Sequence, residues 1–282
     1  MAYSRMVSGQ TRSRRVIESP DGAFVFSGVA PGRYSIIAIA TATNEGTFSG
    51  KSIVVVGEET PVSTEIVLSG GSVLRGRVGM PDDAALPGEA KHVVLAPFEP
   101  GGVVFAPVRA AEIARDGSFE LSRVGTDRYR IQIGDLPDNY YVSAAYLGDE
   151  EVLSAGIYGG LGFPGSAFLR IVLSRDAARI AGAVESRDGH PVAGATVVLI
   201  PEDRERRTQF FRCPWTTTDT FGKFSIAHVK PMKYRALAWR EVPLGRWMDP
   251  NFLGGYLPKA EELEVGKGSV VEIRLQEIDN HQ

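Results

Sequence analysis

The residues that could hold a metal ion are few and widely spaced. The chain has four histidines, His92, His190, His228 and His281. It contains neither a His-Glu-x-x-His motif nor a His-x-x-Glu pair with a distant histidine, so the ligands of a zinc peptidase are missing. We therefore expect no metal site and no bound cofactor.

Nucleophilic catalysis has an equally weak basis. The single cysteine, Cys213, has no histidine nearby in the sequence to activate it, so a buried or unpaired thiol is the better interpretation. The chain has no Gly-x-Ser-x-Gly motif, and its Gly-Gly pairs lack the strand-to-helix context of a phosphate-binding loop. The sequence thus predicts a protein that is not an enzyme.

The best candidate for a binding surface is an aromatic and charged segment, residues 239–252. We expect the segment 209–215, which ends in Trp215, to lie nearby. Such a mixture of side chains suits stacking on sugar rings or anchoring of a protein partner. The alternative is that these aromatic residues cap a domain or pack between domains. The candidate ligand-binding residues are Trp215, Trp239, Arg240, Arg246, Trp247, Asp249 and Asn251.

The elements that must position these residues are short strands. Hydrophobic residues make up 43% of the 282-residue chain and charged residues 23%, which is ordinary for a globular protein. The 32 glycines and 17 prolines indicate many turns. A net charge of −3 argues against a nucleic-acid partner. The sequence has no apolar run of transmembrane or signal-peptide length, so we expect no membrane insertion.

Three segments of the chain resemble one another. An aromatic strand motif recurs at Phe24, Phe119 and Phe224, which are 95 and 105 residues apart, and each motif is followed by a tyrosine at the same distance. Side chains alternate between apolar and polar in all three segments, as in strands with one buried face. We expect each tyrosine ring to be buried with its hydroxyl bonded to the backbone. No segment has a convincing helical period.

These repeats predict an all-β protein of three units, residues 1–69, 70–175 and 176–282. The first unit lacks a recognisable opening strand, because nothing before Asp21 matches the segments that open the other two. We therefore expect a truncated first sandwich, and we infer a longer natural protein or an incomplete start. A half-sandwich would leave an apolar face and strand edges exposed.

The third and first units resemble carboxypeptidase regulatory-like domains. The run Ile180–Leu199 is similar to the Gly-x-Val and Asp-Gly-x-Pro-Val-x-Gly-Ala-x-Val opening of that family, and Asp21–Tyr34 is similar to its second half. The second unit departs from the pattern at Met80–Gly88 and at Gly125-Thr126. The resemblance implies tandem seven-stranded antiparallel Greek-key β-sandwiches of the transthyretin type, which are also grouped with starch-binding-like folds.

The resemblance also implies a function and a location. Tandem arrays of this kind are common in secreted and envelope proteins of bacteria. We therefore predict a non-catalytic binding, scaffold or spacer module of a larger extracellular, periplasmic or envelope protein, with a protein or polysaccharide partner. The alternative prediction is carbohydrate binding through the aromatic segment of the third unit.

Overall fold

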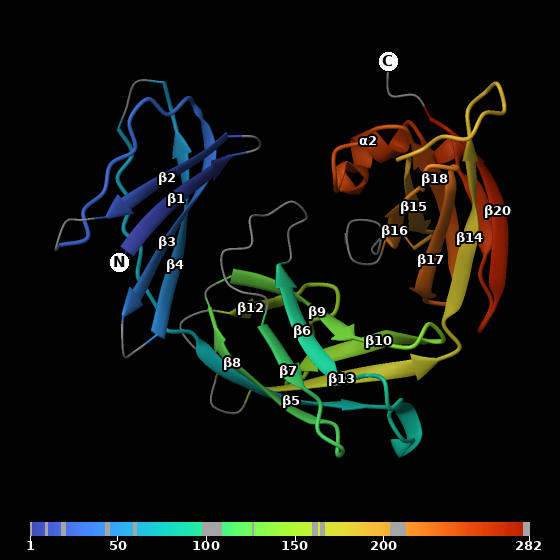
Figure 1. Ribbon diagram of the computed structural model, residues 1–282, viewed down its shortest axis with the longest axis horizontal. Coiled ribbons are helices and arrows are strands. Elements are labelled where there is room, and N and C mark those ends of the chain that lie inside the picture. The colour runs from blue at the N-terminus through green and yellow to red at the C-terminus, as the bar shows by residue number, and fades with distance from the viewer. Residues whose placement is uncertain are drawn as a thin grey trace.

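A computed structural model describes residues 2–8, 11–17, 21–42, 46–58, 61–97, 109–125, 127–159, 163, 167–203 and 213–278. These residues form an all-β protein with several sheets and only short helical turns, which confirms the predicted fold class (Figure 1). None of the helices in these ranges has the length or the apolar composition to cross a membrane.

The third unit consists of two facing sheets with seven strands. One sheet has the order β17-β14-β20 and the other has the order β16-β15-β18-β19. The strands are β14 (Ala178–Glu185), β15 (Thr196–Pro201), β16 (Trp215–Thr217), β17 (Lys223–Val229), β18 (Lys233–Trp239), β19 (Glu261–Glu264) and β20 (Val270–Gln276).

The second unit repeats this plan with additional short strands. Its sheets have the orders β11-β10-β13-β5-β8 and β12-β9-β6-β7. The strands are β5 (Ser72–Gly79), β6 (His92–Pro97), β7 (Arg109–Glu112), β8 (Ser118–Val124), β9 (Asp127–Gly134), β10 (Tyr140–Leu147), β11 (Glu150–Glu151), β12 (Ile157–Gly159) and β13 (Phe168–Arg175), and the 3-10 turn η1 (Pro81–Asp83) follows β5.

The strand pairs of these two units are antiparallel, as the sequence predicted, except for one parallel pair in each unit. The opening strand β5 pairs in parallel with the closing strand β13, and β14 pairs in parallel with β20. The first and last strands of a unit run in the same direction because the intervening chain returns to the starting end. The Greek-key connection stays a prediction.

The first unit contains one four-stranded sheet of order β2-β1-β3-β4. Its strands are β1 (Ala2–Ser8), β2 (Thr11–Ile17), β3 (Gly32–Ala42) and β4 (Gly46–Val56). Residues before Asp21 do form paired strands, because β1 pairs along the edge of β3 and β2 pairs with β1. Neither of them occupies the position that the opening strand β14 has in the third unit. Backbone pairing with an available sheet edge does not require side chains that alternate between apolar and polar, so such a strand can have no clear signal in the sequence.

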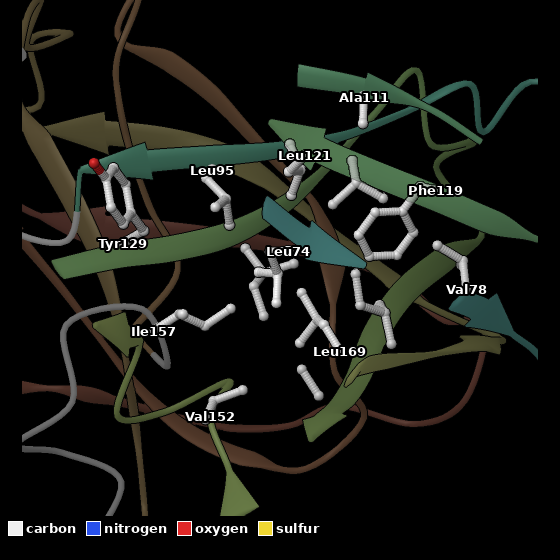
Figure 2. Close-up of a cluster of buried hydrophobic side chains, with 14 of the residues drawn as sticks. Leu74, Val78, Leu95, Ala111, Phe119, Leu121, Tyr129, Val152, Ile157 and Leu169 are labelled. Carbon is white, nitrogen blue, oxygen red and sulfur yellow. The ribbon is translucent and has the colours of Figure 1, made fainter. Parts of the chain in front are cut away.

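Each of the two complete sandwiches has a buried core between its sheets. In the second unit, Leu74 of β5, Phe119 of β8 and Leu169 of β13 face Leu95 of β6 (Figure 2). In the third unit, Phe224 is buried in the equivalent cluster, with 6% of its surface exposed, the same fraction as for Phe119. Alternation along the strands therefore predicted the core-facing residues correctly.

The corner before the tyrosine has the same geometry in all three units. Gly28, Arg123 and His228 adopt left-handed backbone conformations with φ of 67°, 57° and 57°. Each tyrosine hydroxyl then donates to the carbonyl four residues earlier, as expected. The oxygen–oxygen distances are 2.7 Å for Tyr34 and Ala30, 3.1 Å for Tyr129 and Gly125, and 2.9 Å for Tyr234 and Lys230.

This corner bond gives a direct stability prediction. The substitution Tyr234→Phe leaves a carbonyl oxygen without its hydroxyl donor, and we expect it to lower the free energy of unfolding by about 1 to 2 kcal/mol. Urea unfolding measures this loss. The control, Tyr158→Phe, changes a side chain that is 67% exposed and should have almost no effect. Equal stability of the two variants would contradict the assigned role of the corner.

Candidate functional site

The predicted aromatic segment forms a third layer on the outer face of the sheet β16-β15-β18-β19. After β18, the chain makes the turn η3 (Arg246–Met248), the short helix α2 (Pro250–Gly254) and the turn η4 (Leu257–Lys259). Beneath this layer lies a second apolar cluster, which is separate from the core between the sheets. Its buried members are Val198, Ile200, Cys213, Leu237, Trp239, Trp247, Leu253 and Ile278.

The sequence of β15 and β18 explains why this layer exists. Val197 and Leu199 face the core between the sheets, whereas Val198 and Ile200 face the outer cluster, and all four are fully buried. A strand buried on both faces has a continuous apolar run instead of an alternating one. The outer apolar face must be covered, and the segment after β18 covers it.

Two of the three candidate tryptophans are inside this layer. Trp239 and Trp247 have no exposed surface, and the Trp239 ring packs on Tyr256 with the ring centres 5.7 Å apart. The Trp215 ring lies 6.0 Å from that of Trp247 and is 38% exposed. Stacking on a sugar requires an accessible ring face, so the prediction that Trp239 and Trp247 contact a ligand is corrected to a packing role.

The charged candidates hold the layer in place. Arg240 donates two hydrogen bonds, both 2.7 Å long, to the carboxylate of Glu277 just after β20. Arg246 forms an ion pair of 3.0 Å with Asp249. Asp249 also caps α2 by accepting a hydrogen bond of 2.9 Å from the backbone of Asn251.

The seven predicted residues therefore lie together, as the sequence suggested, but most of them bond to one another or to the sheet. Trp215, Arg240, Arg246 and Asn251 present much surface to solvent, whereas Trp239 and Trp247 present none. Residues 209–212 of the neighbouring segment lie outside the described residues. The geometry supports the packing interpretation over a sugar-binding face.

The candidate metal ligands and the candidate nucleophile do not lie together in the described part of the chain. Cys213 is 1% exposed within the outer apolar cluster, and His190 is exposed in a turn. His92 lies 3.9 Å from Asp135, and His228 contacts the second unit. His281 lies outside the described residues. Within the described part of the chain, no three metal-ligating side chains come together.

A small cavity of about 320 Å³ lies where the second and third units meet. Its walls are the apolar Ile131, Ile133 and Met232 together with the cationic Arg130 and Lys230. Burial lowers the pKa of Arg130 below its usual value, because the charged guanidinium is partly removed from water. The cavity is thus part of the contact between two units.

Comparison with known proteins gives no family. No protein-family model matches the chain, and no curated protein matches it. The resemblance to carboxypeptidase regulatory-like domains therefore stays a prediction.

Several solved pilin structures align with the chain over much of its length. A streptococcal ancillary pilin is 11% identical, with 88% of this chain and 76% of the pilin covered and a TM-score of 0.26. The major pilin subunit of Bacillus cereus is 11% identical, with 98% and 93% covered and a TM-score of 0.28. A minor pilin of Streptococcus agalactiae is 12% identical, with 72% and 94% covered and a TM-score of 0.25. These scores are too low for the pilins to inform the function of this chain.

The packing role of the aromatic layer predicts a large difference between two tryptophans. We expect Trp239→Ala to lower the free energy of unfolding by about 3 to 5 kcal/mol, because it leaves a cavity in the outer cluster. We expect Trp215→Ala, at the partly exposed neighbour, to cost at most about 2 kcal/mol. Urea unfolding compares the two. A Trp239→Ala variant of unchanged stability that lost binding to a polysaccharide would contradict the packing role.

Proposed function

We propose that this chain is a non-catalytic scaffold or spacer module, in which tandem β-sandwiches hold and dock other parts of a larger envelope or secreted protein. The observation that carries the proposal is the way in which neighbouring units are joined. Very short connections lead from β13 into β14 and from the first unit into β5, and both are fixed by contacts between units.

The junction between the second and third units is bonded on several sides. The backbone N–H of Ala177 donates to the carbonyl of Asn139 at 3.0 Å. Arg179 at the start of β14 forms an ion pair with Asp138. The ring nitrogen Nδ1 of His228 lies within hydrogen-bond distance of the carbonyl of Tyr140, at 2.8 Å. The left-handed corner thus presents the His228 ring to the neighbouring unit.

The junction between the first and second units is closely packed. Lys51 of β4 forms an ion pair of 3.1 Å with Asp127 of β9, and both side chains are largely shielded from solvent. A methyl group at Gly125 would lie 3.1 Å from the hydroxyl oxygen of Ser49, so Gly125 packs closely against the Ser49 side chain. Connections of this kind restrict the angle between units, which is what a spacer requires.

The location and the lack of catalysis are parts of the same proposal. The resemblance to tandem repeats of secreted and envelope proteins supports an extracytoplasmic location. The packing of the aromatic layer leaves little accessible ring surface for the carbohydrate alternative, so we do not carry it further. Hydrolysis of a peptide or ester by the purified chain, abolished by one substitution, would overturn the non-catalytic assignment.

The rigid junction can be tested by loosening it. We expect a short Gly-Ser insertion between Asp176 and Ala177, combined with Asp138→Ala and His228→Gly, to broaden the distance distribution measured by small-angle X-ray scattering. Glycine retains the left-handed backbone of position 228 and removes only the ring. The melting of the individual sandwiches should change little.

The matched control carries the same insertion in the exposed turn at Gly148 and Asp149, between β10 and β11, away from either junction. It should leave the distance distribution unchanged. An unmodified chain whose distribution is already as broad as that of the loosened variant would contradict the spacer function.

A further inference from the structure

The cavity between the second and third units lies where β10 approaches the end of β17 (Figure 1). The second unit contributes residues of β9, of β10 and of nearby loops. The third unit contributes residues around its tyrosine corner, among them His228, Lys230 and Met232. The volume of about 320 Å³ is at the lower end of the roughly 300 to 1,000 Å³ that is usual for small-molecule pockets. The space therefore suits a small organic molecule.

The cavity exists because two edge strands of the second unit are short. β12 pairs with β9 only at residues 127–129, and β11 pairs with β10 only at residues 146–147. No strand in the described part of the chain extends either pairing along residues 130–133 or 141–143. These two stretches form walls of the cavity. The space is thus built into the two sheets of the unit.

The sheet is also irregular beside the cavity. Three consecutive residues of β10, namely Tyr141, Val142 and Ser143, line it, although neighbours in a regular strand point to opposite faces. The pairing of β10 with β13 shifts in register between Val142 and Ala144, and the hydroxyl of Ser143 donates to the carbonyl of Val172 at 3.0 Å. Such irregularities redirect side chains and are frequent next to functional sites.

Most of the cavity wall is apolar. Several of its side chains are only partly buried, so an apolar ligand would remove more of their surface from water. They are Ile133, Leu136, Val142, Leu153 and Met232. At about 30 Å³ for one water molecule in the liquid, the cavity corresponds to roughly ten non-hydrogen atoms. A ligand of that size with a hydrocarbon body matches these walls.

The charge of the wall favours an anionic group on that ligand. Arg130 of β9 and Lys230 of the third unit line the cavity, and no aspartate or glutamate lines it among the described residues. Burial lowers the pKa of Arg130, because the guanidinium is partly removed from water. A carboxylate in the cavity would replace part of this lost hydration, and its attraction to the cations is strong where water is excluded.

We propose that this cavity binds one small organic carboxylate with an apolar body of about eight carbon atoms, whose carboxylate group is held by Arg130 and Lys230. The hydrocarbon body would lie on the apolar walls at Ile133, Leu136 and Met232. Because the two cations belong to different units, the ligand would bridge the second and third units. This site goes beyond the scaffold function and does not depend on it.

The probe for the site is sodium octanoate, titrated into the full chain by isothermal titration calorimetry. We expect one molecule to bind per chain. 1-Octanol has the apolar body without the charge, and acetate has the charge without the body, so each should bind at least about tenfold more weakly. Equal affinities for octanoate and octanol, or no octanoate binding at millimolar concentration, would overturn the proposal.

Variants of the cationic residues test how the carboxylate is held. Arg130→Met and Lys230→Met each keep an apolar stem and remove one charge, so each should weaken octanoate binding about tenfold or more. The control, Arg115→Met, removes a cation from an exposed position of the second unit outside the cavity and should leave the affinity unchanged. Circular dichroism verifies that the variants are folded. Unchanged octanoate affinity in either folded cavity variant would contradict the bridging role.

The unmodified chain gives a second measurement that does not depend on the folding of a variant. Octanoate should shift the NMR resonance of the Met232 methyl group and leave that of Met80, which lies outside the cavity, unchanged. Equal shifts of the two resonances would show nonspecific adsorption and would overturn the proposal. Failure of octanoate to bind would leave the scattering result on the junctions unaffected, so the two proposals fail separately.

Discussion

Pairing of the opening strand with neighbours on both of its edges is the interaction on which the sandwiches of this chain depend. A central strand satisfies the backbone groups of two neighbours and places its inner side chains in the core. β14 does this for the third unit, where Ile180 and Val184 are fully buried. Its Gly182 has no side chain because a Cβ would collide with the carbonyl of Ile273 on β20. Glycine at the centre of a strand, usually unfavourable, is therefore required by close packing.

The order of strands along the chain also joins the units to one another. Because each closing strand leads almost directly into the next opening strand, a single pair of residues, Asp176 and Ala177, connects two complete sandwiches. The corner residue His228 and the loop at Asp138 then fix the angle. The short connection and the contacts across it thus follow from one repeated strand order.

The sequence predicted the elements that obey a local rule. Alternation around Phe119 and Phe224 identified core strands, and the spacing from each phenylalanine to the following tyrosine identified the corner bond. The signal for the outer layer was also present, since the unbroken apolar run from Val197 to Ile200 is typical of burial on both faces. The residue types of the following segment instead favour a binding surface at Trp239 and Trp247, because composition alone does not show which side of a sheet a loop covers.

Other features could not be predicted from local pattern. β1 forms along the edge of β3 by backbone pairing. The sequence of residues 2–8 does not alternate clearly between apolar and polar side chains, so it does not predict this strand. The contact of His228 with Tyr140 joins two residues that are 88 positions apart in the sequence, so no local pattern predicts it.

The most direct test of the central claim is amide hydrogen exchange of the free chain, compared at equivalent segments of the three units. If the opening strand holds each sandwich closed, the amides of β8 and β17 exchange slowly, whereas those of residues 24–28 exchange at nearly unprotected rates. Equally slow exchange of all three segments in a monomeric chain would show that the first unit closes without a central strand, and would contradict this account.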